Sequence, residues 1–165
     1  MRGKVLVRVL VIILILAGAT VFFRNQSPKS GVIELIAQGK PVVGQTFETT
    51  LTISVDQTIN AGEFVFNFPP ELLSVKEIKK DGSFYQLWVT DSPSFSNEAG
   101  TISLAGGLPS PGFSGTGTVA TIVFEAKKAG SAEITLDTTK SQLLANDGLG
   151  TIVPARFKPV TFKLK

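Results

Sequence analysis

Apolar and polar residues alternate along most of the chain after Gly31, and this period of two constrains the fold more than any other feature of the sequence. In the clearest run, residues 47–56, every second residue from Phe47 to Val55 is apolar or threonine, and polar residues lie between them. Successive side chains of a β-strand point to opposite faces of its sheet, so this run fits a half-buried strand. No useful length shows the period of a helix. Residues 31–165 are therefore predicted to be all-β.

Shorter runs repeat the alternation and are separated by glycine, proline, asparagine and aspartate. Pro69-Pro70 ends one of them, because proline cannot donate a hydrogen bond to a strand ladder. About nine strands at this spacing predict a β-sandwich whose two sheets bury the phenylalanine-rich rows. We expect strands near residues 32–37, 47–56, 64–68, 73–79, 85–90, 101–105, 120–126, 134–136, 143–145 and 160–164.

The longest apolar run, residues 5–23, begins with Val5, ends with Phe23 and contains one charge, Arg8. As a helix it would span about 28 Å, close to the roughly 30 Å hydrocarbon core of a bilayer. Arg8 lies about one turn from the start, where its side chain can reach the headgroups. We therefore expect an N-terminal transmembrane helix, a signal anchor, over residues 1–23, a polar linker over residues 24–30 and one domain over residues 31–165.

Basic residues set the expected orientation of this helix. Arg2, Lys4, Arg8 and the amino terminus outweigh Arg24 and Lys29 on the other side of the apolar run. Cytoplasmic flanks carry the excess of positive charge, so we expect a cytoplasmic N-terminus and an extracytoplasmic domain in a single-pass protein of the cell membrane.

A cleavable signal peptide is the alternative to an anchor. Ala17-Gly18-Ala19 supplies the small residues of a cleavage site, and a cut after Ala19 would give a secreted protein. The apolar run continues to Phe23 and stops at the basic Arg24, which favours the uncleaved anchor.

Charge and residue types narrow the function. Five of the 16 basic residues precede residue 31 and all 13 acidic residues follow it, so residues 31–165 carry a net charge of −2. Such a domain does not offer the basic face that binds nucleic acid. The chain has neither cysteine nor histidine, which removes thiol chemistry and the commonest general base and metal ligand. We expect a binding module without a cofactor rather than an enzyme.

Four stretches in order resemble the cohesin family, the jelly-roll sandwich modules that capture dockerin domains. They are residues 43–47 (VGQTF), 61–68 (AGEFVFNF), 117–126 (GTVATIVFEA) and 143–152 (LLANDGLGTI). The resemblance implies a jelly-roll β-sandwich, a dockerin-type or other surface protein as partner, and a role in cell-surface scaffolding or polysaccharide-degrading assemblies. A carbohydrate-binding module of the same architecture is the alternative.

One position departs from the family pattern. Cohesins often read Y-D-P after the second stretch, and the aspartate helps to grip the dockerin, whereas this chain has Phe68-Pro69-Pro70. Pro69 stands in place of that aspartate, which puts a conventional dockerin contact in doubt.

The resemblance places the partner on an exposed sheet face. By alternation, the outward residues of the strand near residues 64–68 and of its neighbour near 101–105 form the candidate partner-binding set; the competing interpretation of each is an ordinary solvated face. The set is Glu63, Val65, Asn67, Ser103 and Ala105.

The segment 106–117 is too rich in glycine, proline and serine for regular structure, yet it carries Leu108 and Phe113. Either these side chains pack beneath a loop or they form recognition tips, so both join the candidate partner-binding set. Tyr85 and Trp88 are expected on opposite faces of their strand, which leaves little aromatic surface for stacking polysaccharide.

Acidic residues offer no clear reactive site. Asp137 and the run Asn146-Asp147-Gly148 are typical of turns and lack the ligand spacing of an EF-hand, so no metal is expected. No phosphate-binding loop and no nucleophile elbow occurs, and no catalytic residue is assigned.

Overall fold

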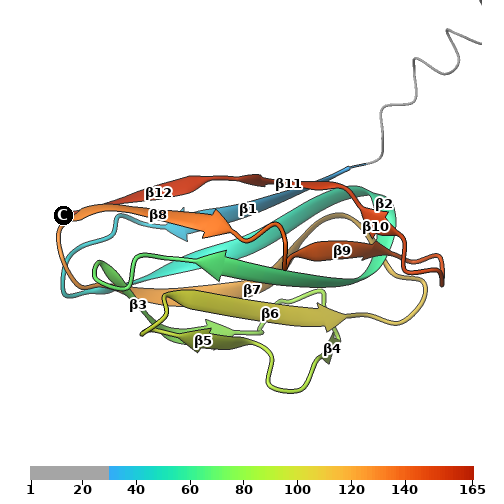
Figure 1. The fold of residues 1–165 in the computed structure, drawn as a ribbon, viewed down its shortest axis with the longest axis horizontal. Helices are drawn as coiled ribbons and strands as arrows, with labels where there is room; N and C mark the ends of the chain where they lie inside the picture. The colour runs from blue at the N-terminus through green and yellow to red at the C-terminus, as the bar shows by residue number, and fades with distance from the viewer. Residues whose placement is uncertain (1–29) are drawn as a thin grey trace, which may run out of the picture.

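The computed structural model of the protein describes residues 30–165, and all regular secondary structure within them is β-strand (Figure 1). This confirms the all-β prediction for that part of the chain. The predicted transmembrane helix over residues 1–23 and the linker up to residue 29 lie outside the described residues. From residue 30 onward, the chain forms no helix of the length and apolar character that a bilayer crossing requires. The strands are β1 (Gly31–Gln38), β2 (Thr46–Asn67), β3 (Leu73–Lys79), β4 (Leu87–Trp88), β5 (Ser94–Ser96), β6 (Thr101–Gly107), β7 (Phe113–Ala126), β8 (Gly130–Leu136), β9 (Gln142–Ala145), β10 (Ile152–Val153), β11 (Ala155–Lys158) and β12 (Val160–Leu164).

Strand β2 joins the two layers of the sandwich. The sequence predicted two strands here, near residues 47–56 and 64–68, and the structure instead has one strand of 22 residues that bends between them. Its first half pairs with β1 and β7, and its second half pairs with β6 and β9. The register with β7 shifts between Val55 and Ile59, which marks the bend. A bend at a β-bulge lets one strand pass from sheet to sheet without breaking.

The first layer therefore runs β11, β1, the first half of β2, β7 and β3. In the second layer, the second half of β2 lies between β6 and the pair β8 and β9, which follow one another along the same edge of β2. The outer strands of this layer are β4 and β5 beyond β6, and β10 and β12 beyond β9 and β8. Twelve strands form where about nine were predicted: β5 and β10, of three and two residues, are too short to show alternation, and β11 was also not predicted.

The inward rows of both layers form the core. Phe64 and Phe66 are fully buried in the second half of β2, and Phe124 of β7 is fully buried opposite them. Phe124 packs against Phe47 and Phe68, with ring centroids 5.8 Å away in each case. The sequence-predicted rows of phenylalanine thus lie inside, as their alternation indicated.

Tyr85 fills a gap that two glycines leave in the core. Gly62 and Gly106 are paired residues of β2 and β6, and neither has space for a side chain. A Cβ on Gly106 would meet Tyr85 Cδ2 at 2.8 Å, and one on Gly62 would collide with the tyrosine hydroxyl. The ring of Tyr85 therefore lies directly on the backbone of the pair, and this close approach requires both glycines.

The segment around Tyr85 corrects two predictions. The strand expected over residues 85–90 is reduced to β4, Leu87–Trp88, so alternation does not apply to Tyr85. Tyr85 and Trp88 were predicted on opposite faces, but their rings are in edge contact at 5.6 Å, and both pack against the core. The segment 106–117 is likewise more regular than predicted, because β6 extends to Gly107 and β7 begins at Phe113.

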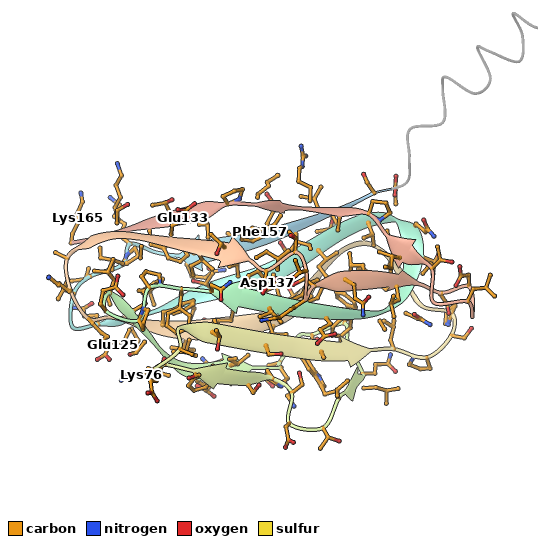
Figure 2. The ribbon with its side chains drawn as sticks, in the orientation of Figure 1. Lys76, Glu125, Glu133, Asp137, Phe157 and Lys165 are labelled. Carbon is orange, nitrogen blue, oxygen red and sulfur yellow. The ribbon has the colours of Figure 1, made fainter. Side chains whose placement is uncertain are left out.

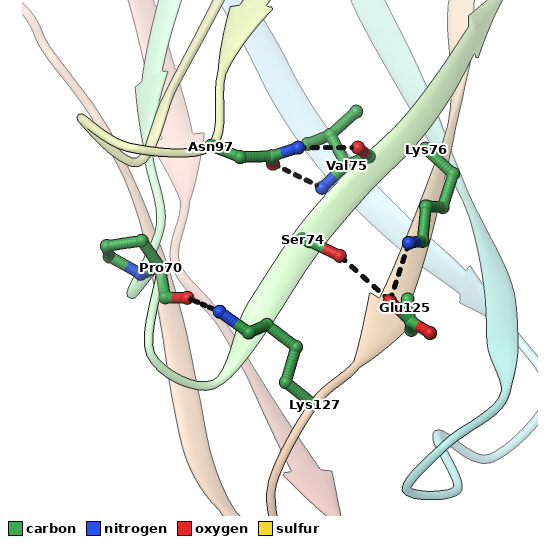
Figure 3. Close-up of polar contacts among 7 residues, drawn as sticks. All are labelled: Pro70, Ser74, Val75, Lys76, Asn97, Glu125 and Lys127. Atoms are coloured by element: carbon green, nitrogen blue, oxygen red, sulfur yellow. Dashed lines mark hydrogen bonds and ion pairs between the residues drawn. The ribbon is translucent and has the colours of Figure 1, made fainter.

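Asn97 closes the open edge of β3 (Figure 3). Its side-chain amide donates to the carbonyl oxygen of Val75 at 2.9 Å, and its Oδ1 accepts the N–H of Val75 at 2.7 Å. The amide thereby takes the place of a neighbouring strand at Val75, on the edge of β3 that faces away from β7. Satisfying these groups blunts the edge and links the loop after β5 to the opposite layer.

Candidate partner-binding surface

The pairing of β2 with β6 brings five of the predicted site residues together. Glu63 lies opposite Ala105, and Val65 lies opposite Ser103, while Asn67 lies at the end of the row, opposite Thr101. Their side chains are half-buried or exposed, whereas Phe64 and Phe66 between them are buried. We call the outward side of β9, the second half of β2, β6 and β5 the candidate face. Whether these residues bind a partner stays a prediction.

Side chains from neighbouring segments hold the backbone of this face in place. Between β8 and β9, where β2 lacks a partner strand, Ser141 Oγ accepts the N–H of Val65 at 2.9 Å, and the N–H of Asp137 donates to the Val65 carbonyl at 2.8 Å. On β6, the N–H of Ala105 donates to Ser92 Oγ at 2.6 Å. Because these backbone groups are satisfied, the face is a preformed surface.

The candidate face is almost free of charge. Among the outward residues of its four strands, Glu63 is the one ionisable group. The others are small hydroxyl, amide or apolar residues, and they are Ala61, Val65, Asn67, Ser94, Ser96, Thr101, Ser103, Ala105, Gln142 and Leu144.

The outer side of the first layer, which we call the opposite face, has a different composition. Three cross-strand pairs of hydroxyl residues occupy its centre: Thr50 with Thr121, Thr52 with Thr118, and Ser54 with Thr116. Ion pairs surround them, namely Lys158 with Glu34, Lys79 with Glu48 and Lys76 with Glu125. Paired charges and threonine ladders stabilise a solvated sheet, so nothing in this pattern calls for a partner.

Two of these ion pairs shift the pKa of their members. The hydrogen bond from Lys76 lowers the pKa of Glu125, and Ser74, 3.1 Å away, adds to the shift (Figure 3). The hydrogen bond with Glu48 raises the pKa of Lys79. Figure 2 shows Lys76 and Glu125 toward the end of the molecule at which Lys165 terminates the chain. Both shifts stabilise charges on exposed strands and prepare no reactive group.

The carboxyl groups near the candidate face are held in turns. Hydrogen bonds from Thr139 lower the pKa of Asp137, and a hydrogen bond from Thr151 is the main cause of the lowered pKa of Asp147. In residues 30–165, no three histidine, cysteine or acidic side chains converge in an arrangement that suits a metal ion.

The remaining predicted site residues lie at one end of the sandwich. Leu108 and Phe113 are partly buried and pack against the core, and the ring of Phe113 stacks on Phe84 with centroids 4.1 Å apart. The structure therefore places both side chains beneath the loop between β6 and β7 and apart from the row around Val65.

Pro69 lies just beyond Asn67, where the candidate face ends. Its carbonyl oxygen accepts the N–H groups of Leu72 and Leu73 at 3.1 and 3.0 Å, which makes a turn into β3. This end of the face thus has a proline turn and no carboxylate at the position where the family often carries one.

The fold and its sequence can be compared with known proteins. The sequence profile described as the cohesin domain matches residues 33–158. The chain belongs to the cohesin family. This match covers β1 to β11 nearly in full, including the candidate face, so the cohesin domain accounts for almost all of the described structure. No curated protein sequence matches the chain.

Solved cohesin structures share the fold at low sequence identity. A non-cellulosomal cohesin from the archaeon Archaeoglobus fulgidus is 20% identical, with 82% of this chain and 91% of that chain covered and a TM-score of 0.65. The third cohesin of ScaC from Acetivibrio cellulolyticus, solved in complex with the ScaB dockerin, is 18% identical, with coverages of 81% and 98% and a TM-score of 0.64. A cohesin–dockerin complex from Clostridium thermocellum is 12% identical, with 85% of this chain and 95% of that chain covered and a TM-score of 0.67.

Sequence reasoning missed four apolar residues beside the predicted row, three of them exposed. Leu87 and Val89 are 62% and 58% exposed, Ile152 is 61% exposed, and Leu144 is half-buried on the candidate face. Their strands, or the segment after β4 in the case of Val89, are too short for alternation to assign a face. Only the pairing of β4 with β6, and of β10 with β9, reveals that they lie together.

Proposed function

We propose that this cohesin domain binds a dockerin-type protein through its candidate face. Recognition of this kind joins two proteins and involves no reaction, in agreement with a chain whose shifted carboxyl groups are explained by ion pairs and turns. The family match supports the partner class, because cohesins of the same fold, such as the one from Acetivibrio cellulolyticus, have been solved in complex with dockerins.

The contrast between the two sheet faces carries the proposal. The opposite face has three ion pairs and three pairs of hydroxyl residues, whereas the candidate face has one charge, Glu63, and a preformed backbone. Charged residues are depleted from the centres of protein interfaces, since a buried charge loses its hydration. The candidate face is therefore the part of the outer surface that suits contact with another protein, while β8 and β12 of the same layer carry the exposed Glu133 and Lys163.

A binding experiment with matched variants tests this proposal. The probes are dockerin modules encoded in the genome that encodes this chain, together with the ScaB dockerin of Acetivibrio cellulolyticus. We expect at least one probe to bind the full chain with a Kd of about 1 µM or tighter. Ser103→Arg, which puts a charge at the centre of the face, should weaken binding at least about tenfold, whereas Thr52→Arg on the opposite face should not. Binding to none of the probes, or equal loss in both variants, would refute the proposal.

We further propose that the protein is anchored in the cell membrane by residues 1–23, with the domain outside the cell. The apolar run from Val5 to Phe23 and the basic residues before it support this setting. The anchor would hold the domain near the membrane through a short linker, so that a bound partner stays at the cell surface.

Cell fractionation separates the anchor from a cleaved signal peptide. An anchored chain should resist extraction by high salt or carbonate, dissolve in detergent and be digested by protease added from outside. A soluble extracellular protein whose N-terminal residue is Thr20 by mass spectrometry would show cleavage after Ala19. The binding proposal would then still stand.

The aromatic side chains do not support the alternative function, carbohydrate binding. Tyr85 is buried, and Trp88 packs on it in edge contact, with the Lys80 ammonium 5.0 Å from the indole ring centre. Stacking on a sugar requires an open aromatic face, which the buried Tyr85 does not present.

A further inference from the structure

Apolar residues form a row across the strands at one end of the candidate face. Ala61 of β2 pairs with Leu144 of β9, which pairs with Ile152 of β10. On its other side Ala61 pairs with Gly107 of β6, which pairs with Leu87 of β4. Paired residues point to the same side of a sheet, so the row crosses five strands.

A second, shorter row lies next to the first. The N–H of Val89 donates to the carbonyl oxygen of Ala105 at 3.1 Å, which places Val89 beside Ala105. We call the residues of both rows the apolar strip, and they are Ala61, Leu87, Val89, Ala105, Leu144 and Ile152. Single exposed apolar residues are ordinary on a protein surface, but adjoining ones mark contact sites.

The two ends of the candidate face therefore differ. The apolar strip has large exposed side chains at both edges, namely Leu87 and Val89 on one side and Ile152 on the other, with two alanines and the half-buried Leu144 between them. The end at Asn67 has Ser96, Thr101 and the proline turn at Pro69. Most binding energy at interfaces comes from desolvated apolar anchors near the centre of contact, which the strip offers and the polar end does not.

The spacing of the strip fits a helix that lies across the strands. Neighbouring strands are about 4.8 Å apart, and side chains three or four residues apart on a helix are about 5–6 Å apart. A row over five strands extends about 19 Å, which a helix of about 13 residues covers at 1.5 Å per residue. Gly107 has no side chain to project between Ala61 and Leu87, so a helix can approach the sheet closely there.

A groove lies beside Ile152, at the edge of the sandwich between the two layers. It has a volume of about 190 Å³ and runs between β10 and the segment that leads into β9. Leu136, Leu143 and Val153 supply apolar parts of its lining.

We infer that the dockerin-type partner is anchored on the apolar strip by the uncharged, apolar stripe of one of its helices, rather than at the Asn67–Pro69 end of the face. The inference rests on the proposed function and assigns its binding energy to residues that alternation alone did not reveal. Contact between apolar surfaces has little Coulombic contribution, so its affinity depends weakly on ionic strength.

Variants at the two ends of the face test the inference in the full chain with the dockerin probes described above. Leu87→Asp and Ile152→Asp should each weaken binding at least about tenfold, because each puts a charge into the apolar contact. Asn67→Ala, at the polar end, should weaken binding less than either of these variants, and Thr50→Asp, on the opposite face, should change the Kd less than about threefold. Raising the salt concentration from about 0.05 M to about 0.5 M should also change the Kd less than about threefold. Thermal unfolding of each variant checks that the domain is intact.

The outcomes separate the inference from the proposed function. Binding that survives Leu87→Asp and Ile152→Asp but is lost in Asn67→Ala overturns the inference and leaves dockerin binding in place. A dimer of this chain that Leu87→Asp dissociates assigns the strip to a second copy and also overturns it. If no probe binds the parent chain, both are refuted. Amide exchange of the bound probe should show protection along a helix, and protection of an extended segment would contradict the inferred geometry.

Discussion

Neighbouring residues of β2 have opposite surroundings, and this difference can be measured. Phe66 is fully buried between the layers and lies 5.5 Å from the ring of Phe157, whereas Val65 points outward to the candidate face. Phe66→Ala should lower the free energy of unfolding by about 3–5 kcal/mol, through lost burial and the cavity left behind. Val65→Ala, its control, should cost much less in denaturant unfolding. Similar losses for both would mean that the strand's two faces are not distinguished.

The buried hydroxyl of Tyr85 is expected to lower the stability of the domain. It is buried and has no hydrogen-bond partner among the described residues, and burial raises the pKa of the phenol. A buried polar group without a partner is destabilising, whereas the ring itself fills the space above Gly62. Tyr85→Phe should therefore raise the free energy of unfolding by about 1 kcal/mol. Tyr85→Ala should lower it strongly, and a loss of stability in Tyr85→Phe would indicate that the hydroxyl has a partner such as a buried water.

At the scale of single elements, the edge strand β3 depends on one side chain from outside it. Asn97→Ala would leave the N–H and carbonyl of Val75 without their partner, which should lower stability by about 1–2 kcal/mol. The exposed edge should also promote association, because unpaired strand edges pair with other chains. Light scattering during mild heating checks this, with the exposed neighbour Glu98→Ala as control. Equal aggregation of the two variants would argue against the edge role of Asn97.

The elements also show how far sequence alone reaches. Alternation located most of the long strands and the buried row at Phe64 and Phe66, because a half-buried strand must show a period of two. It did not reveal that β2 is continuous, since the bend at residues 55–59 interrupts the pattern in the way a turn would. It could not orient Leu87 or Ile152 either, because strands of two residues have no period. Their place on the apolar strip follows from pairing between distant segments.

At the scale of the whole molecule, the described part of the chain has a closed core between two layers. Residues 31–165 should therefore fold alone into a monomer, because the buried rows of β2, β6 and β7 pair within the domain and the fragment carries a net charge of −2. Circular dichroism should show a β spectrum, and sedimentation should give the monomer mass. Substantial helix, or an unfolded fragment, would contradict this architecture.

The charges of the whole domain set its response to pH. The chain has no histidine and no cysteine, so no side chain ordinarily titrates between about pH 5 and pH 8. The pKa values of Glu125, Asp137 and Asp147 are lowered in the folded state, by hydrogen bonds from Lys76, Thr139 and Thr151 respectively. A carboxyl whose pKa is lowered by folding stabilises the fold above its unfolded pKa, and this stabilisation is lost as pH falls through the folded value.

We therefore expect stability to be nearly constant from about pH 6 to about pH 9 and to fall below about pH 4. Lys79, whose pKa is raised by Glu48, behaves in the opposite sense: its stabilisation is full below its unfolded pKa and is lost as pH rises through the folded value, at strongly alkaline pH. Denaturant unfolding at a series of pH values measures both the loss of stability at low pH, the acid limb, and the loss at high pH. Asp137→Asn should flatten the acid limb, and Thr139→Val should do the same, because it removes the main hydrogen bond that lowers the pKa of Asp137. A transition near pH 6.5 in the parent chain, or an acid limb unchanged in both variants, would show that other groups control the stability.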